Sequence, residues 1–198
     1  MLYEIDPNDV TRFNRSDSEL EAFLLFAILV AGKKASMQSR KLKDFLTRNC
    51  AYEDESPFDI IRRLIKDGDL AYAIRVDGLG QYRKLETCLP ILVNAQLDLN
   101  TCSVEELEAI PFIAMKTSRF FVLHSRQDAQ YAALDVHILR YMRENMDIDT
   151  PRQTPSSKKQ YLKLEQTFLK HCETNGLTPS NFDLAIWMAG ANKQGMTT

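Results

Sequence analysis

A lysine and an aspartate are set into a largely apolar part of the chain, residues 110–142. Lys116 is followed 19 residues later by Asp135, which directly precedes a second apolar run. A lysine amine with its ordinary pKa of about 10.4 is protonated at neutral pH, so it becomes a nucleophile only where burial or a cationic neighbour lowers that pKa. Phe112 and Phe121 could provide apolar surroundings. The plainer alternatives are a lysine that binds a phosphate at a helix start and an aspartate that only caps a helix.

Helical signals surround this pair. Residues 16–32 begin with capping residues and end at a glycine, which predicts a buried helix of about four turns. Ser103 and Glu106 form a capping-box pattern, which predicts a short helix that ends near Pro111. A helical pattern resumes after the next turn, and Asp135 is well placed as the N-cap of the helix that follows.

The rest of the chain has the same apolar spacing of three and four residues, with Gly, Pro, Ser and Asp at the boundaries. Further helices are therefore predicted at residues 36–48, 57–68, 80–96, 158–176 and 180–190. Pro90 should kink or shorten the helix at 80–96. Residues 71–76 are the single candidate for an extended segment. The sequence therefore predicts an all-α protein of about ten helices without an internal repeat.

Composition limits the function classes. Twenty-five basic and 27 acidic residues give a net charge of −2, which argues against a protein that coats nucleic acid indiscriminately. Any DNA contact must be local, and residues 33–48 are the densest basic region. The chain has no long apolar run and no signal-peptide pattern, so we expect a soluble intracellular protein with no membrane partner. The four cysteines form no CxxC pair, so we expect reduced, mostly buried thiols and neither zinc nor an iron–sulfur cluster.

The segment "LEAIPFIAMKTSRFF", followed by "AALDVHILRYM", resembles the helix-hairpin-helix and downstream aspartate of the DNA glycosylase superfamily. That superfamily includes endonuclease III, the adenine glycosylases and the 8-oxoguanine DNA glycosylases. Its pattern of leucine, proline, lysine, aspartate and histidine is matched here by Leu107, Pro111, Lys116, Asp135 and His137. The C-terminal "FDLAIWMAG" is similar to that of the short-chain 8-oxoguanine glycosylases of archaea and some bacteria.

The resemblance spans roughly residues 20–192 and implies the helix-hairpin-helix DNA glycosylase fold. In this fold two tightly packed helical subdomains hold the site in the cleft between them. We expect a single glycosylase domain over residues 1–198, with one subdomain at about 30–133 that includes the hairpin at 104–124. The N- and C-terminal helices, 1–29 and 134–198, are expected to form the second subdomain.

The resemblance also implies an activity. A bifunctional DNA glycosylase and abasic-site lyase would flip a damaged base out of the duplex, 8-oxoguanine being the first candidate. Lys116 would attack C1′ and form a Schiff base that nicks the strand by β-elimination, and Asp135 would stabilise charge at the sugar and help deprotonate the lysine. Two alternatives stay open: a related glycosylase for another damaged or modified base, and a DNA-binding hairpin protein without catalysis.

Further residues take roles from the resemblance, each with a structural alternative. Residues expected at the DNA are Phe112, Ile113, Ala114, Met115 and Thr117 of the hairpin, His137, and Lys33 and Lys34 after the first long helix. His137 could equally be a structural histidine, and the two lysines could lie on a solvated surface. Phe182 and Trp187 could stack on a flipped purine, or could pack the last helix on the core.

One part of the hairpin departs from the family pattern. Where the family has Gly-x-Gly, this chain has Phe112-Ile113-Ala114. Glycine there allows unusual backbone angles and close approach to a DNA phosphate. The departure bears on DNA affinity and on the cation that the family often binds at the hairpin carbonyls. No cofactor is expected to be required, and the expected partner is double-stranded DNA with a damaged base, bound by a monomer in the cytoplasm or nucleoid.

Overall fold

Ten helices and no strand make up the part of the chain that the structure describes. The structure, a computed structural model, describes residues 4–194 and the side chains of residues 4–190. No helix within these residues is both long enough and apolar enough to cross a membrane. The helices are α1 Asp17–Leu29, α2 Ala35–Asn49, α3 Pro57–Asp67, α4 Leu70–Val76, α5 Tyr82–Asn94, α6 Val104–Glu108, α7 Met115–Ser125, α8 Val136–Asn145, α9 Lys158–Thr174 and α10 Pro179–Gln194. The predicted all-α class is confirmed.

One predicted element is wrong: residues 71–76 belong to helix α4, not to an extended segment. Leu70, Ala73 and Ile74 are buried, whereas Tyr72 and Val76 are exposed. This is the spacing of one buried helix face. The short stretch alternates small and large side chains, which is why its sequence also fits a strand.

Pro90 does not shorten helix α5, which continues four residues further to Asn94. A proline inside a helix removes one backbone hydrogen bond. Leu89, Leu92 and Val93, which lie around and after the proline, are all buried. Burial of this apolar face therefore outweighs the missing hydrogen bond.

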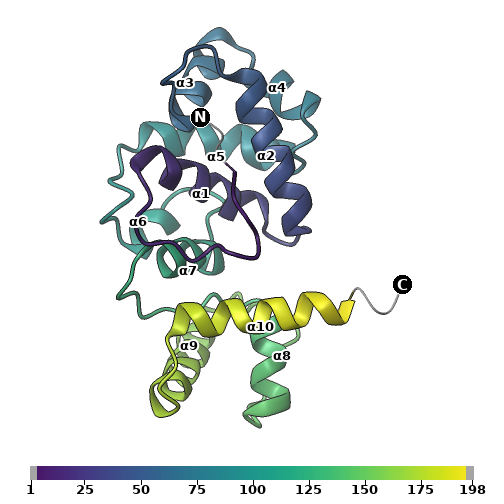
Figure 1. The fold of residues 1–198 in the computed structure, drawn as a ribbon, viewed down its shortest axis with the longest axis vertical. Helices are drawn as coiled ribbons and strands as arrows, with labels where there is room; N and C mark the ends of the chain where they lie inside the picture. The colour runs from purple at the N-terminus through teal and green to yellow at the C-terminus, as the bar shows by residue number, and fades with distance from the viewer. Residues whose placement is uncertain (1–3, 195–198) are drawn as a thin grey trace.

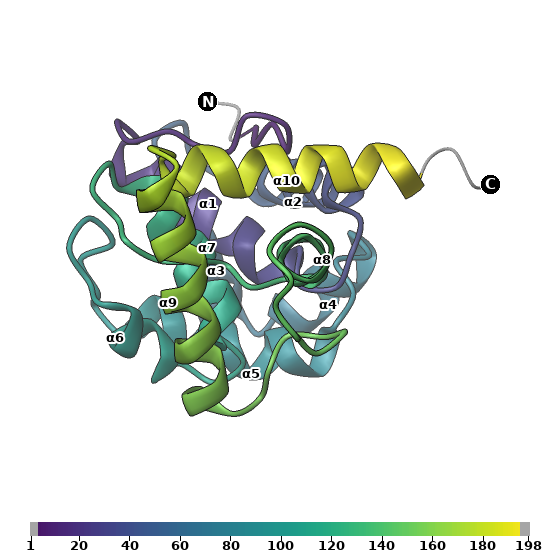
Figure 2. The ribbon, with the colours of Figure 1, turned by 90° about the horizontal axis from the view of Figure 1, so that it is seen from below.

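Apolar side chains form two core clusters. The first core cluster joins the N-terminal segment to α1–α7, and the second joins α8–α10 to Ala132 and Leu134. In Figure 1 the helices of the first cluster lie above α10, while α8 and α9 extend below it. Figure 2 shows α8 and α9 on the same side of α10. Ile186 of α10 belongs to the second cluster and Trp187 packs against the first, so α10 contacts both.

The core clusters do not follow the expected grouping of residues 1–29 with residues 134–198. Helix α1 packs with α2, α3 and α7, because its side chains are buried on nearly every face. The division of the chain into two subdomains with a cleft between them stays a prediction.

The N-terminal segment holds the end of helix α7. Arg15 Nη1 donates to the carbonyl oxygen of His124 at 2.9 Å, and the backbone N–H of Arg12 donates to the same oxygen at 3.1 Å. Thr11 Oγ1 lies 2.8 Å from His124 Nδ1. A cation at a helix C-terminus also complements the helix dipole. The helix that carries Lys116 is therefore closed by a segment from the start of the chain.

The four cysteines are free thiols. Cys88, Cys102 and Cys172 are buried, and Cys50 is exposed. Burial raises the pKa of the Cys88 thiol to about 11. The three buried thiols are therefore protonated and pack as small apolar side chains.

Candidate active site

The hairpin turn, residues 109–114, joins α6 to α7. Ser103 caps α6, and the side chain of Glu106 accepts from the backbone N–H of Ser103 at 2.8 Å, so the predicted capping box is confirmed. The N–H of Ile113 donates to the carbonyl oxygen of Ile110 at 3.1 Å and closes the turn. Ile113 itself is buried in the first core cluster. Local capping and one apolar anchor thus fix where α7 begins.

Phe112 has a backbone conformation that usually needs glycine. Its φ is +70°, in the left-handed region, and its side chain is 53% exposed. A bulky residue is rare in this region, where an L-residue is strained by about 1–2 kcal/mol. The turn therefore keeps the backbone shape that the missing glycine would give, and places an aromatic ring on the surface beside the start of α7.

Lys116 and Asp135 begin two neighbouring elements of the site. Lys116 lies in the first turn of α7, is half-buried, and has its Nζ 4.9 Å from the centroid of the Phe120 ring. Asp135 is the N-cap of α8, and its Oδ1 accepts from the backbone N–H groups of His137 at 2.8 Å and Ile138 at 3.0 Å. The predicted capping role of Asp135 is therefore confirmed, and it leaves Oδ2 without a hydrogen-bond partner among residues 4–190.

Lys116 lies near enough to Asp135 for its charge to act on the carboxyl group, although the two side chains form no direct ion pair or hydrogen bond. Burial raises the pKa of Asp135 above its ordinary value, and the carboxylate of Asp183 acts in the same direction. The ammonium of Lys116 opposes this and favours the ionised carboxylate, as do the amide of Ile138 and the ring of His137. An acid with a raised pKa is a better proton acceptor from a neighbouring amine.

Asp183 of α10 is a buried carboxylate that the sequence did not single out. Its Oδ2 lies 3.3 Å from Nε2 of the fully buried His124, and its Oδ1 has no hydrogen-bond partner in the described part of the chain. A neutral His124 can donate from Nε2 to Asp183 while Nδ1 accepts from Thr11. Asp183 lies in the "FDLAIWMAG" segment, which carried the resemblance without a role for any of its polar residues.

Other predicted DNA-contacting residues fall into two groups. Ala114, Lys33 and Lys34 are exposed, while Met115 and His137 are partly buried. The side chains of Ile113 and Thr117 are buried, so they do not present a surface to DNA in this structure. The DNA contact of the accessible residues stays a prediction.

His137 lies against α10. A Cβ built on Gly190 would overlap His137 Nδ1 and would lie 2.8 Å from Arg140 Nη2. Arg140 Nη2 in turn lies 3.4 Å from His137 Nδ1. The absent side chain of Gly190 therefore allows α10 to pack closely on the first turns of α8, behind Asp135.

The two aromatic residues proposed for a base pocket differ in their surroundings. The Phe182 ring stacks on Phe168, with centroids 5.6 Å apart, and makes an edge contact with Tyr141 at 5.1 Å. These contacts are those of a core residue and argue against stacking of Phe182 on a base. Trp187 is partly buried against the first core cluster, and its role at a base stays a prediction.

The hairpin turn offers little to a cation. The carbonyl oxygens of Ile110 and Ala114 already accept backbone hydrogen bonds, and residues 109–114 include no acidic side chain. Across residues 4–190 no group of three His, Cys, Asp or Glu side chains is arranged to hold a metal ion. A cation at the hairpin carbonyls stays a prediction, and no step below depends on one.

The all-α chain, with a short helical hairpin formed by α6 and α7, has the fold of the helix-hairpin-helix DNA glycosylases. A solved structure to which it is similar is the 8-oxoguanine glycosylase/lyase of Methanocaldococcus jannaschii in complex with a 15mer DNA containing 8-oxoguanine. The two share 22% identity with a TM-score of 0.68, over 94% of this chain and 87% of that chain. No protein-family model and no curated protein sequence matches the chain.

Proposed function

We propose that this protein is a DNA glycosylase and abasic-site lyase, with 8-oxoguanine as the first candidate base. The observation that carries the proposal is that Lys116, 19 residues before the partly buried Asp135, lies near enough for its charge to act on that carboxyl group, in the fold of a glycosylase/lyase. A structural lysine has no need of a buried carboxylate with a raised pKa. A nucleophilic amine does, because it must lose a proton before it attacks.

In the first chemical step the neutral Lys116 amine attacks C1′ of the flipped nucleotide. A bond forms between Nζ and C1′, the bond from C1′ to the base breaks, and the base leaves with the bonding electron pair and takes up a proton. Asp135 Oδ2, which is not engaged in capping, is free to accept the lysine proton. While ionised, the same carboxylate stabilises positive charge that develops at the sugar.

In the second step the sugar ring opens and the C1′–Nζ bond becomes a protonated imine. This imine acidifies the protons on C2′. Loss of one of them forms a C1′–C2′ enamine that expels the 3′ phosphate, which nicks the strand, and water then releases the lysine. Asp135 is positioned by the first turn of α8, whose amides favour the anion.

The DNA partner would approach the face that carries the hairpin turn. Phe112 and Ala114 are exposed there, and Lys33 and Lys34 are exposed at the start of α2. The amides of Met115 and Lys116 at the start of α7 have no side-chain cap, and helix N-termini bind phosphate well. We expect a monomer to bind double-stranded DNA in this way.

Borohydride trapping tests the proposal. The protein is incubated with duplexes that contain one 8-oxoguanine, one abasic site or no lesion, and borohydride reduces any imine to a stable adduct. We expect an adduct on the first two duplexes for the unchanged protein and none for Lys116→Gln. Lys84→Gln, which changes an exposed lysine of α5, serves as the matched control and should trap normally.

Each outcome separates the alternatives. Trapping on the abasic site alone would keep the lyase chemistry and move the search to another damaged base. No adduct on either lesion, with intact binding, would leave a DNA-binding hairpin protein without catalysis. An adduct that persists in Lys116→Gln would refute Lys116 as the nucleophile.

A further inference from the structure

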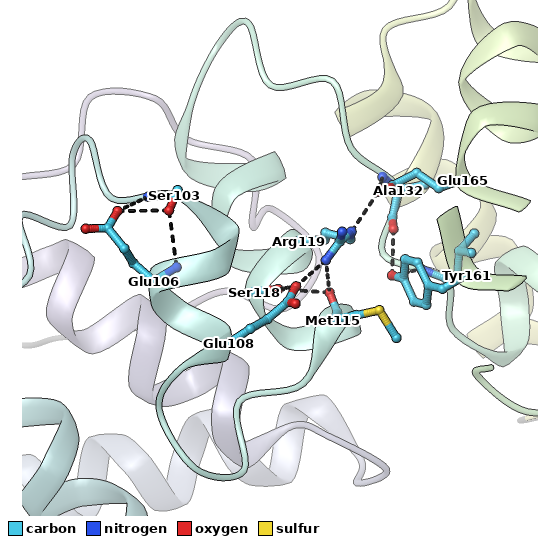
Figure 3. A network of polar contacts seen from close by, with 10 residues as sticks. Ser103, Glu106, Glu108, Met115, Ser118, Arg119, Ala132, Tyr161 and Glu165 are labelled. Carbon is cyan, nitrogen blue, oxygen red and sulfur yellow. Dashed lines mark hydrogen bonds and ion pairs between the residues drawn. The ribbon is translucent and has the colours of Figure 1, made fainter. Parts of the chain in front are cut away.

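Arg119 lies three residues after Lys116 and is among the most deeply buried side chains of the described residues. Its exposure is 2%, although it carries a full positive charge. Its Nε donates to Glu165 Oε1 of α9 at 2.9 Å, and its Nη1 donates to Glu108 at the end of α6. Figure 3 shows the guanidinium between these two carboxylates. One side chain therefore joins the Lys116 helix to α6 and to α9.

The same α9 carboxylate reaches the segment that leads to Asp135. Glu165 Oε1 also accepts from the backbone N–H of Ala132 at 3.0 Å. One turn earlier on α9, the Tyr161 hydroxyl donates to the carbonyl oxygen of Ala132 at 2.8 Å and accepts from the N–H of Leu134 at 3.1 Å. The peptide groups directly before Asp135 are thus held by two side chains of α9, as seen at the right of Figure 3.

Arg119, Glu165, Tyr161 and the backbone of residues 132–134 will be called the α7–α9 network. None of its side-chain nitrogen or oxygen atoms is buried without a partner in the described residues. Two aromatic rings lie near the guanidinium, with the centroids of Tyr131 and Tyr161 at 5.8 and 5.0 Å from Arg119 Cζ. Hydrogen bonds between buried groups are strengthened by the low local dielectric, so the network resists displacement of α7, α9 and residues 132–134 relative to one another.

We infer that Arg119, Glu165 and Tyr161 are positioning residues, which set the placement of Asp135 relative to the Lys116 amine. The inference rests on the proposed function. None of the three is proposed to touch DNA or the reacting atoms, and they act through the backbone. A misplacement of about 1 Å at a reacting pair can cost about 100-fold in rate.

Helix α9 itself supplies neither member of the reactive pair. It does supply Glu165 and Tyr161, two side chains that hold residues 132–134, and its Glu165 is shared between that segment and α7. Thr154, which precedes α9, also donates to the Leu134 carbonyl oxygen at 2.7 Å. The position of α9 therefore bears on the placement of Asp135 relative to the Lys116 helix. An ion pair that only stabilised the fold would not need Glu165 to bind both Arg119 and the backbone before Asp135.

Two variants of the full chain test the inference. Glu165→Leu removes the shared carboxylate, and Tyr161→Phe removes only the hydroxyl that holds Ala132 and Leu134. The measurements are the single-turnover rate of nicking of an abasic-site duplex and the dissociation constant for a duplex with a stable abasic analogue. We expect the rate to fall about 10- to 100-fold for Glu165→Leu and by a smaller factor for Tyr161→Phe, with affinity within about twofold.

Controls separate positioning from general destabilisation. Tyr141→Phe removes a hydroxyl that lies 3.4 Å from His171 on the far side of α8, and should leave the rate unchanged. Glu165→Gln keeps an oxygen that can accept from Arg119 and Ala132, and should recover most of the rate lost in Glu165→Leu. Circular dichroism at the assay temperature confirms that each variant is folded.

The pH dependence of the nicking rate distinguishes a positioning role from a stabilising role, because loss of stability alone would not shift it. The Lys116 charge favours ionised Asp135, so separating the two groups raises the pKa of Asp135 further. Its other charged neighbours, Asp183 and His137, stay in place. The acidic limb of the nicking profile should therefore move to higher pH in the slowed variants.

The outcomes are distinct. Where Glu165→Leu does not fold, Tyr161→Phe decides. A folded Tyr161→Phe that nicks at the unchanged rate, or a Tyr141→Phe that is slowed equally, would overturn the inference while the proposed function stands. An unchanged protein that nicks nothing would instead refute the proposed function.

Discussion

The two sides of the Lys116 helix are built in opposite ways. In front of Lys116, the hairpin turn exposes an aromatic ring, holds Phe112 in a strained backbone conformation and leaves the start of α7 without a side-chain cap. Behind Lys116, the side chains of the α7–α9 network are buried, and none of their fully buried polar atoms lacks a partner among the described residues. At the start of α7, the strained backbone and the uncapped amides thus lie together at the hairpin turn, a combination that is typical of functional sites.

This difference suggests a division of work. The groups on the front side gain partners only when a ligand binds. Substitutions there should therefore change the stability of the fold little and the affinity for the ligand more. The rear side holds charges that must be paired inside the protein, so its loss is costly to folding or to alignment. Substitutions on the two sides should therefore differ in both the size and the kind of their effects.

The largest expected effect is that of Asp135→Asn. Asparagine keeps the N-cap acceptor but cannot take a proton from Lys116, so single-turnover nicking should fall about 100- to 10,000-fold. A variant that nicks at the unchanged rate would show that Asp135 only caps α8.

The same variant should be more stable than the unchanged protein at neutral pH. The pKa of Asp135 is raised in the folded state, so the folded protein binds this proton more tightly than the unfolded chain does. Ionised Asp135 therefore lowers stability at neutral pH, and the loss is relieved as the pH falls through the raised pKa toward the ordinary value of about 3.9. Urea unfolding at pH 7 and at acidic pH should show a stabilisation that shrinks with falling pH; a constant difference would contradict this assignment.

Arg119→Met should give the largest loss of stability. It leaves Glu165 and Glu108 buried without their cation, which typically costs about 3–5 kcal/mol. Arg12→Met is the comparison on the surface, because its pair with Glu19 is largely exposed and should contribute about 1 kcal/mol or less. Denaturant unfolding of both variants measures the contrast, and equal losses would remove the distinction between the two sides.

Gly190→Ala should have an intermediate effect. The added Cβ would meet the His137 ring and the Arg140 guanidinium at the start of α8, and relief of that overlap should cost about 1–3 kcal/mol. Ala189→Ser, on the exposed face of the same helix, should change stability by less than about 0.5 kcal/mol. Thermal unfolding of the pair checks this, and a neutral Gly190→Ala would show that α8 and α10 can separate freely.

Phe112→Gly should have the smallest effect on stability and the opposite sign. Glycine removes the strain of the left-handed backbone conformation, but it also makes the unfolded chain more flexible. The free energy of unfolding should therefore rise by about 1 kcal/mol or less. If the exposed ring contacts DNA, its loss should weaken binding to an abasic-analogue duplex by about fivefold, equivalent to about 1 kcal/mol of buried apolar surface. Tighter binding by the glycine variant would show that the ring obstructs the DNA.

Local signals in the sequence predicted the helix starts around the site. The helix start with capping residues at Ser16, the capping box at Ser103 and the N-cap at Asp135 each depend on residues within three positions, and all three are present in the structure. Short-range hydrogen bonds can be read from adjacent residues because the chain itself brings them together.

The rest of the site depends on contacts between distant residues. Arg119 and Glu165 are 46 residues apart in the sequence, and His124 and Asp183 are 59 apart. No local sequence pattern could therefore predict either contact. The positive φ of Phe112 could not be predicted from the sequence either, because phenylalanine rarely adopts that conformation. Lys116 and Asp135 could be proposed as a reactive pair only because their spacing matched a family; the groups that the structure places around them could not be proposed from the sequence.

The contact between the N-terminal segment and α7 bears on how the chain folds during synthesis. Arg15 and the His124 carbonyl it binds are 109 residues apart, so the first segment must wait until most of the domain has been made. Long-range closures of this kind form late and slow folding. Residues 6–19 include four acidic and two basic side chains, which suit a segment that must stay hydrated while it waits. The far end of the Lys116 helix is therefore secured only once translation has passed it.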